Sequence, residues 1–466
     1  MTAINAGARL DRLPVSRFHY RMLGLIGAGM FLDAFEIYLQ GAVLATLVST
    51  GWSTPALNAN FISVTFAGMV VGAWLAGILG DRYGRRFSYQ VNLLIFGGAS
   101  LVGAFAPTMS WLIAARFVMG CGLGAEIVVG YVALSEIVPP RSRGRWGAAL
   151  AVVTNSALFF SALIGRAVIP NFGWRWMFVI VGIGALIVWY LRKSMPESPR
   201  WLEAKGHTAE AERVLSEIER EVEADGKTLP PAPLVERIAL EKASLGALFS
   251  RGMLMRTITG SILLIALNTT IYGFIAFLPT FMVKQGINIV TSLNYTTLMS
   301  FGGPVGALIG MWLSDKAGRK PCIVVFSVLA IIFGVLYPQT TDPTLLTIIG
   351  FLLVTAVYVL VAIAWGLYVP ELFPTEIRMR GAGFCNTAGR LMTIVTPQLA
   401  VPLFAATGIS GVIGLVTGLL VVQVVMVAVF GIETKAKSLE ELAPSADDVA
   451  MSSAAAARRP SAGALS

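Results

Sequence analysis

The stretch that decides the fold is Gly77-Ile-Leu-Gly-Asp-Arg-Tyr-Gly-Arg-Arg86, a charged loop at the end of a long apolar segment. A second version, Asp315-Lys-Ala-Gly-Arg-Lys320, also ends an apolar segment, and its aspartate is the counterpart of Asp81. Such a return far along the chain indicates that the protein is built from two related halves.

Further matches at almost the same offset extend this repeat. Gly68 and Gly72 have glycine counterparts at the offset that separates Asp315 from Asp81, and Glu136-x-x-Pro-x-x-x-Arg143 returns at a nearly identical offset as Glu371-x-x-Pro-x-x-x-Arg378. We therefore predict four regions: a half at 1–192, a central loop with short helices at 193–255, a second half at 256–432, and a mostly disordered tail at 433–466. Halves of this kind hold their substrate between them near the membrane midplane.

The composition makes lipid the expected solvent. Of the 466 residues, 56% are hydrophobic and 13% are charged, whereas a soluble domain has about 25% charged residues. Apolar runs of about 20 residues, the length of a membrane-crossing helix, recur along the chain. We predict an all-α membrane protein with 12 transmembrane helices, six in each half. The expected spans are 21–48, 58–80, 87–106, 109–137, 145–169, 174–192, 256–283, 290–314, 321–339, 342–371, 378–406 and 409–432.

The net charge of +9 is placed in a way that argues for a membrane and against nucleic acid. Basic residues gather in alternate connections, and Arg175 and Lys284 are the exceptions on the other side. By the positive-inside rule, both termini are expected in the cytoplasm of a cell whose inner membrane holds the chain. Because Cys121, Cys322 and Cys385 have no ligand spacing, we expect no metal site and no cofactor.

These motifs resemble those of the major facilitator superfamily, and more narrowly of its sugar-porter-like branch. The resemblance rests on Gly77–Arg86, Pro196-Glu-Ser-Pro-Arg-Trp-Leu202, Pro370–Arg378 and Glu433-Thr-Lys. Span 7 lacks the glutamine-rich run of sugar porters. Span 1, with Phe31-Leu-Asp-Ala-Phe-Glu36, and span 11, with Gly389-Arg390, are similar instead to bacterial niacin and aromatic-acid symporters, relatives of organic-ion and synaptic-vesicle transporter-like proteins. The resemblance implies alternating-access transport.

Ionisable side chains inside spans are costly, at about 2.5–3.5 kcal/mol each, and so need a function. Asp33 and Glu36 lie three residues apart on one helix face, where mutual repulsion and burial favour protonation of at least one. We assign proton coupling to these two with Arg116 and Glu126, and the resemblance favours an Asp33–Arg116 pair. The alternative is a static pair that joins spans 1 and 4. Glu126 could instead be a neutral acid bonded to a neighbouring span.

The substrate site is expected to centre on Arg390. By the offset that relates Glu371 to Glu136, its counterpart in the first half is Asn155, so the two helices place polar side chains toward a common cavity. A guanidinium binds a carboxylate through two hydrogen bonds, which favours an anionic substrate. The alternative partners for Arg390 are helix carbonyls or Glu126. The remaining candidate binding residues, polar or aromatic, are Asn268, Tyr272, Trp365 and Tyr38.

Charged residues in the repeated loops are expected to form a cytoplasmic gate, an ion network that latches the inner side. The alternative is that the arginines only set topology. The candidates are Asp81, Arg85, Arg86, Glu136, Arg143, Asp315, Arg319, Glu371 and Arg378.

The function expected from these features is proton-coupled symport of a small organic anion, an aromatic or heteroaromatic monocarboxylate. The partners are this substrate, protons and the bilayer, and the chain is expected to act as a monomer. The alternatives are a sugar or polyol symporter, an exporter of drugs or metabolites, and a transporter-like sensor. We do not expect an enzyme, because no nucleophile–base or metal constellation occurs.

Overall fold

The computed structural model describes residues 5–139, 142–231, 245–340, 342–373 and 377–434. Long helices dominate the chain up to residue 191. They are α2 (Arg17–Ser49), α3 (Pro55–Tyr83), α4 (Arg85–Ala104), α5 (Met109–Ile137), α6 (Arg143–Phe172) and α7 (Arg175–Leu191). We call these six helices the first half.

The second half contains interrupted helices. A π-helical turn, η4 (Thr270–Phe274), and a 3-10 turn, η5 (Ile275–Phe277), join α10 (Arg251–Thr269) to α11 (Leu278–Lys284). Another π-helical turn, η7 (Ala364–Tyr368), joins α15 (Pro343–Ile363) to α16 (Val369–Glu371). The remaining helices are α12 (Ile289–Ser300), α13 (Gly302–Ala317), α14 (Arg319–Leu336), α17 (Arg378–Thr407) and α18 (Ile409–Phe430).

Within the described residues, 10 helical stretches are long and apolar enough to cross a membrane. The helices α5 and α17, with 29 and 30 residues, are not among them, but each is long enough to cross about 30 Å of hydrocarbon. Together these segments are consistent with the 12 expected spans.

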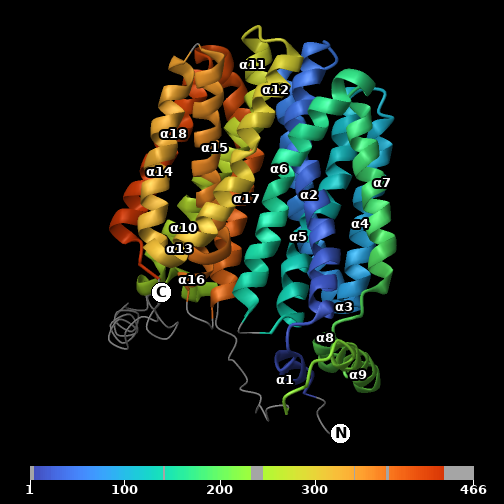
Figure 1. Ribbon diagram of the computed structural model, residues 1–466. Helices are drawn as coiled ribbons and strands as arrows, with labels where there is room; N and C mark the ends of the chain where they lie inside the picture. The colour runs from blue at the N-terminus through green and yellow to red at the C-terminus, as the bar shows by residue number, and fades with distance from the viewer. Residues whose placement is uncertain (1–4, 140–141, 232–244, 341, 374–376, 435–466) are drawn as a thin grey trace, which may run out of the picture.

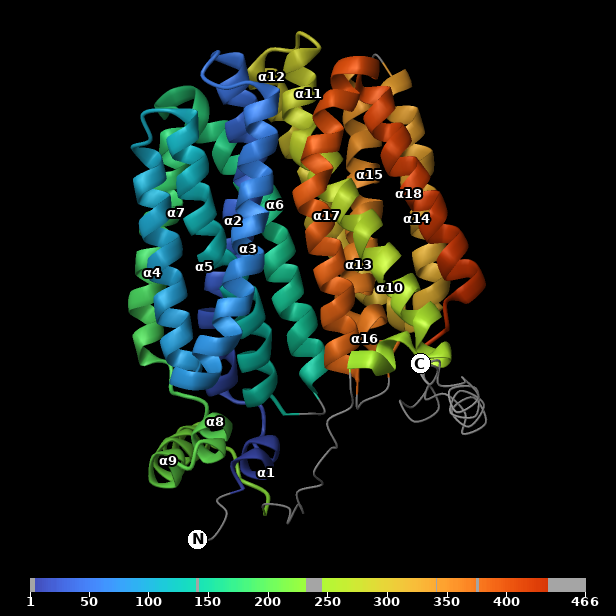
Figure 2. The same ribbon diagram turned by 180° about the vertical axis from the view of Figure 1, so that it is seen from behind.

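The two halves stand side by side, with three short helices beneath the first half (Figure 1). These are α1 (Ala6–Asp11), α8 (Pro199–Ala204) and α9 (Thr208–Ala224), and the last two follow the 3-10 turn η2 (Arg192–Ser194). Figure 2 shows the same arrangement from behind. We call the end of the bundle that carries α9 the α9 end, and the opposite end the far end.

Glycines allow α3 and α5 to pack backbone against backbone. A Cβ atom added to Gly68 would collide with the carbonyl oxygen of Phe117, and one added to Gly124 would collide with that of Met69. In the second half, α13 packs on α15 in the same way, since a Cβ on Gly306 would collide with the carbonyl oxygen of Thr355. Only glycine permits this approach.

The repeated loops are capped alike in both halves. Gly84 and Gly318 have φ angles of 101° and 95°, which suit glycine, and each precedes a helix. Glu197 accepts hydrogen bonds from the backbone N–H groups of α4, with Oε1 2.8 Å from the Arg85 nitrogen. Glu433 does the same for α14, with Oε1 3.0 Å from the Arg319 nitrogen.

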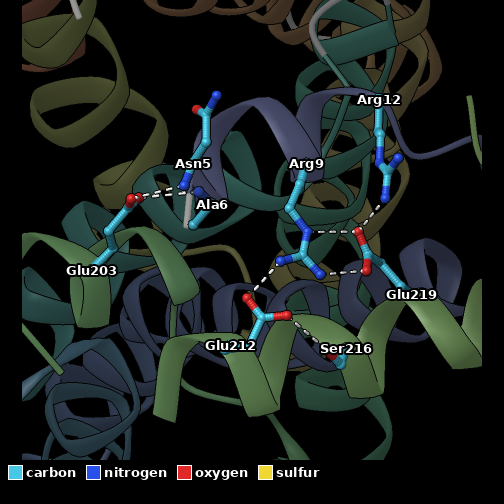
Figure 3. A network of polar contacts seen from close by, with 8 residues as sticks. All are labelled: Asn5, Ala6, Arg9, Arg12, Glu203, Glu212, Ser216 and Glu219. Carbon is cyan, nitrogen blue, oxygen red and sulfur yellow. Dashed lines mark hydrogen bonds and ion pairs between the residues drawn. The ribbon is translucent and has the colours of Figure 1, made fainter. Parts of the chain in front are cut away.

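The helix α1 is fastened to α8 and α9 by a polar network, which we call the clasp (Figure 3). Arg9 lies 2.6 Å from Glu219 and 2.7 Å from Glu212, and Arg12 lies 2.7 Å from Glu219. Beneath this network, apolar side chains of the two segments pack together, including Leu10 and Leu215. The clasp therefore joins the start of the chain to the central loop.

The halves touch each other toward the far end. There α17 packs along α3, α12 packs along α6, and α11 packs against α2. Hydrogen bonds between described residues cross the interface in the same region, from Ser63 to the Ile394 carbonyl at 2.6 Å and from Gln398 to Asn60 at 2.9 Å. The far end is therefore the closed end of the interface.

Candidate functional site

One face of α2 carries the central acidic residues. Gly29, Asp33 and Glu36 are spaced by four and three residues, so they form a single stripe along the helix. Asp33 and Glu36 are 1% and 0% exposed. Opposite this stripe, Arg116 and Glu126 of α5 are ten residues apart, or about 15 Å along the helix axis. The stripe and α5 enclose a column of buried charges.

The upper part of this column, nearer the far end, is a buried ion pair between Glu36 and Arg116, both with fully buried side chains. The guanidinium of Arg116 also donates to the Thr65 hydroxyl on α3 at 3.0 Å and lies 4.6 Å from the centre of the Phe61 ring. The close packing of α3 on α5 brings these partners within reach. Arg116 therefore fastens α5 to both α2 and α3.

The expected pairing of Arg116 with Asp33 is wrong in this structure. Glu36, one helical turn farther along the same stripe, takes the guanidinium instead. Both carboxylate oxygens of Asp33 are buried and make no hydrogen bond to a described residue. The sequence could not separate these acids, because residues three apart share a face.

The lower part of the column is a second buried ion pair, between Glu126 and Arg192, with 2.6 Å between charged atoms. Arg192 also donates to the carbonyl oxygens of Leu25 and Ile26 on α2, at 2.9 and 3.0 Å. A Cβ at Gly29 would collide with the guanidinium, so a larger residue there would displace the Arg192 side chain. Glu126 is therefore the partner of Arg192 and not of Arg390, which was an expected alternative.

The residues that flank Arg192 predict a position at the membrane surface, and this prediction is wrong. Next to Lys193 at the end of an apolar run, it has the pattern of a topology-setting surface charge. In the structure it is 1% exposed, because its side chain turns back from η2 between α2 and α5. The only available signal was the glycine at position 29, which leaves room for it.

Arg390 of α17 faces this column from the second half. The guanidinium of Arg390 interacts electrostatically with the carboxylate of Asp33 and with the hydroxyl of Tyr272. The Nη1 atom of Arg390 is buried and has no hydrogen-bond partner among described residues. Asn268 is adjacent, since its amide nitrogen would lie 2.7 Å from a Cβ added to Gly389. The structure thus gathers Asp33, Arg390, Tyr272 and Asn268.

The two π-helical turns carry the aromatic candidates of the second half. Tyr272 lies in η4, and its ring contacts Phe66 of α3 across the interface, with 4.5 Å between ring centres. Trp365 lies in η7, and its indole nitrogen is buried without a partner among described residues. A π-helical turn inside an α-helix is often found at functional sites.

The remaining binding candidates lie around the interface but are less directly connected. Tyr38 lines a small cavity of about 50 Å³ with Gly41, Ser161 and Pro279, and its ring centre lies 6.4 Å from that of Tyr358. Asn155 is 7% exposed on α6, where its carbonyl oxygen would lie 3.4 Å from a Cβ added to Gly303. No hydrogen bond between described residues joins Asn155 or Trp365 to Arg390.

The gate candidates form ion pairs inside each half at the α9 end. Arg85 lies 3.5 Å from Glu136, and Arg319 lies 3.3 Å from Glu371. Ser198 donates to Glu136 at 2.6 Å, and Arg86 donates to the Lys193 carbonyl at 2.7 Å. Arg378 donates to the Phe373 carbonyl at 3.4 Å.

The side chains of Asp81, Arg143 and Asp315 lie outside the described residues. Across the part of the chain that is described, no group of three or more histidine, cysteine, aspartate or glutamate residues could hold a metal ion.

Comparisons with known proteins cover nearly the whole chain. Residues 29–445 match the family described as sugar (and other) transporter. Inner membrane metabolite transport protein YdjE of Escherichia coli strain K12 is 40% identical, over 94% of this chain and 98% of its own. Niacin transporter NiaP of Acinetobacter baylyi is 31% identical, over 93% and 99%. The inward-open structure of the xylose transporter XylE from E. coli superimposes with a TM-score of 0.69 at 18% identity, covering 91% of this chain and 99% of that one.

Proposed function

Because the chain belongs to the sugar (and other) transporter family of the major facilitator superfamily, we propose that it is a proton-coupled symporter of an aromatic or heteroaromatic monocarboxylate. The predicted family, fold and class are confirmed: this is a multi-pass membrane transporter and not an enzyme. What we propose beyond this is the substrate, the coupling to a proton and the direction of transport.

The observation that carries the proposal is the position of Asp33. Asp33 is buried without a hydrogen-bond partner among described residues, and its carboxylate interacts electrostatically with the Arg390 guanidinium across the interface. An ionised Asp33 therefore competes with a substrate carboxylate for the same guanidinium. A proton on Asp33 removes that competitor, so proton and anion each favour the binding of the other, as thermodynamic linkage requires.

Arg390 and two aromatic side chains of the second half support the substrate class. A guanidinium with an unpartnered buried nitrogen suits a carboxylate. Tyr272 and Trp365, both in π-helical turns, offer aromatic surfaces that suit a flat ring. A relative at 31% identity is named as a niacin transporter, and niacin is a heteroaromatic monocarboxylic acid.

The proposal also includes the orientation of the chain in the membrane and the conformational state of the structure. Basic residues cluster at the α9 end, among them Arg9, Arg12 and Arg21, so we place that end and both termini in the cytoplasm. Since the interface is closed toward the far end, the structure corresponds to an inward-facing state. Import with one proton is electroneutral and is driven by the pH gradient, whereas each additional proton would add about 2.3 kcal/mol per 100 mV of membrane potential.

The test begins with thermal stabilisation of the detergent-solubilised protein by nicotinate, benzoate, xylose and glucose. We expect the acids to stabilise it and the sugars to have no effect. Proteoliposomes with an alkaline lumen should then accumulate the stabilising acid. Stabilisation by a sugar with gradient-driven sugar uptake would replace the proposal with sugar symport, and outward pumping of the acid would make the protein an exporter.

A further inference from the structure

The Glu126–Arg192 pair lies beside Asp33 but has no part in the binding events proposed above. Its charges influence Asp33, together with those of Glu36 and Arg390. The aromatic ring of Tyr89 on α4 lies 4.9 Å from the Arg192 guanidinium and closes the pair off on that side. With a side-chain exposure of 0% for Arg192 and 2% for Glu126, the charges of the pair are not screened by solvent.

The charges of the buried cluster balance. It contains three acids and three guanidinium groups: Asp33, Glu36, Glu126, Arg116, Arg192 and Arg390. With all six ionised, the net charge is zero. A proton on Asp33 makes it +1, and a bound monocarboxylate returns it to zero. A proton without the anion, or the anion without a proton, leaves an uncompensated charge in a medium of low polarity, which is costly.

We propose that Arg192, by holding Glu126 as its anionic partner, is a positioning residue that sets this balance and thereby couples one proton to one monocarboxylate. The inference rests on the proposed function, since it assumes that Asp33 carries the proton. It adds a residue from the end of α7 to the coupling machinery and fixes the stoichiometry at one to one.

The charge balance gives opposite consequences for the two partners. Arg192→Gln leaves one negative charge too many, so Asp33 keeps its proton whether or not the anion is bound. Glu126→Gln leaves one positive charge too many, so Asp33 loses its proton more easily and the anion binds without one. The double variant restores neutrality. If the pair only fastened α7 to α2, the two single variants would not shift the protonation of Asp33 in opposite directions.

The experiment needs no substrate. Spin labels at Thr50→Cys and Lys284→Cys, exposed positions in the two halves at the far end, report opening of that end. They are placed in a background with Cys121, Cys322 and Cys385 replaced by serine. The distance between the labels is measured over a pH series in wild type and in each variant, with Arg192→Lys as the charge-conserving variant and the exposed Lys193→Gln as the matched control.

We expect the pH midpoint to rise by about one unit or more in Arg192→Gln and to fall by a similar amount in Glu126→Gln. The double variant, Arg192→Lys and Lys193→Gln should stay near the wild-type midpoint. Shifts in the same direction, or none, would overturn the role of Arg192. A wild-type distance that does not depend on pH, or a dependence that survives Asp33→Asn, would instead overturn proton coupling itself.

Discussion

The two halves share their close helix packing and their ion pairs at the α9 end, but they differ in their buried charges. Both pack glycines against a neighbouring backbone, both cap a helix with a glutamate, and both pair an arginine with a glutamate at the α9 end. At the offset that relates Asp315 to Asp81, however, Asp33 and Glu36 correspond to Leu267 and Thr270. At the offset that relates Glu371 to Glu136, Arg116 and Glu126 correspond to Phe351 and Val361.

This difference separates the features that both halves share from the buried charges, which differ between the halves. The close glycine packing and the ion pairs at the α9 end occur in both halves, as an alternating movement of two lobes would require. The proposed proton binding needs only one set of buried acids, and Asp33 and Glu36 of the first half supply it. The second half supplies Arg390 where the first half has Asn155. In the proposed mechanism, the proton therefore binds to the first half and the anion binds to an arginine of the second half.

The largest expected effect comes from breaking the Glu36–Arg116 pair, which has no counterpart in the second half. Glu36→Gln leaves a buried guanidinium unpaired, and the free energy of unfolding should fall by about 3–5 kcal/mol. Unfolding in a denaturing detergent series measures it. The double variant Glu36→Leu with Arg116→Met removes both buried charges, which the second half also lacks at the corresponding positions, and it should recover most of the loss. A single variant as stable as wild type would mean that the pair is not buried as described.

The next effect concerns accumulation. With one proton per anion, a gradient of about two pH units sustains about 100-fold accumulation. Asp33→Asn should reduce this ratio to about one while exchange of labelled for unlabelled substrate continues, because binding and lobe movement remain. Asp33→Glu should keep gradient-driven uptake. Accumulation by the asparagine variant would remove Asp33 from the coupling.

A smaller effect is expected at the anion site of the second half. Arg390→Lys keeps the charge but loses the two parallel hydrogen bonds, so the affinity for a carboxylate should fall by about tenfold. Titration calorimetry with the acid that stabilises the protein measures this. Asn155→Ala, at the corresponding position of the first half, should change the affinity by less. Equal losses in both variants would argue against the division of roles between the halves.

The smallest effect concerns the clasp, which joins described segments beneath the first half. The hydrogen bond from Arg9 lowers the pKa of Glu212. A lowered pKa means that the contact stabilises above the ordinary glutamate pKa and is lost as pH falls through the lower folded value. A dye on the N-terminal amine should therefore rotate more freely only below about pH 4. Arg9→Gln should release it already at neutral pH, and release of wild type at a higher pH would contradict the assignment.

The repeated features were predictable from sequence because they depend on local patterns. Apolar length located the spans, and the repeated glycines include Gly68, where α3 packs closely on α5. The partners inside the bundle were not predictable. Whether Asp33 or Glu36 meets Arg116 depends on helix rotation, which sequence does not encode locally, and Arg192 has the flanking pattern of a surface residue. The π-helical turns that carry Tyr272 and Trp365 have no sequence signal of their own.

The most direct test of the central claim measures proton movement driven by substrate. Proteoliposomes containing a pH-sensitive dye, with no initial pH gradient, receive nicotinate or the best stabilising acid outside. Protein-free vesicles give the background from passive entry of the neutral acid. The account predicts that the lumen acidifies above this background by one proton per anion taken up, and that Asp33→Asn abolishes this acidification. Anion entry above background with no change in lumen pH would contradict it.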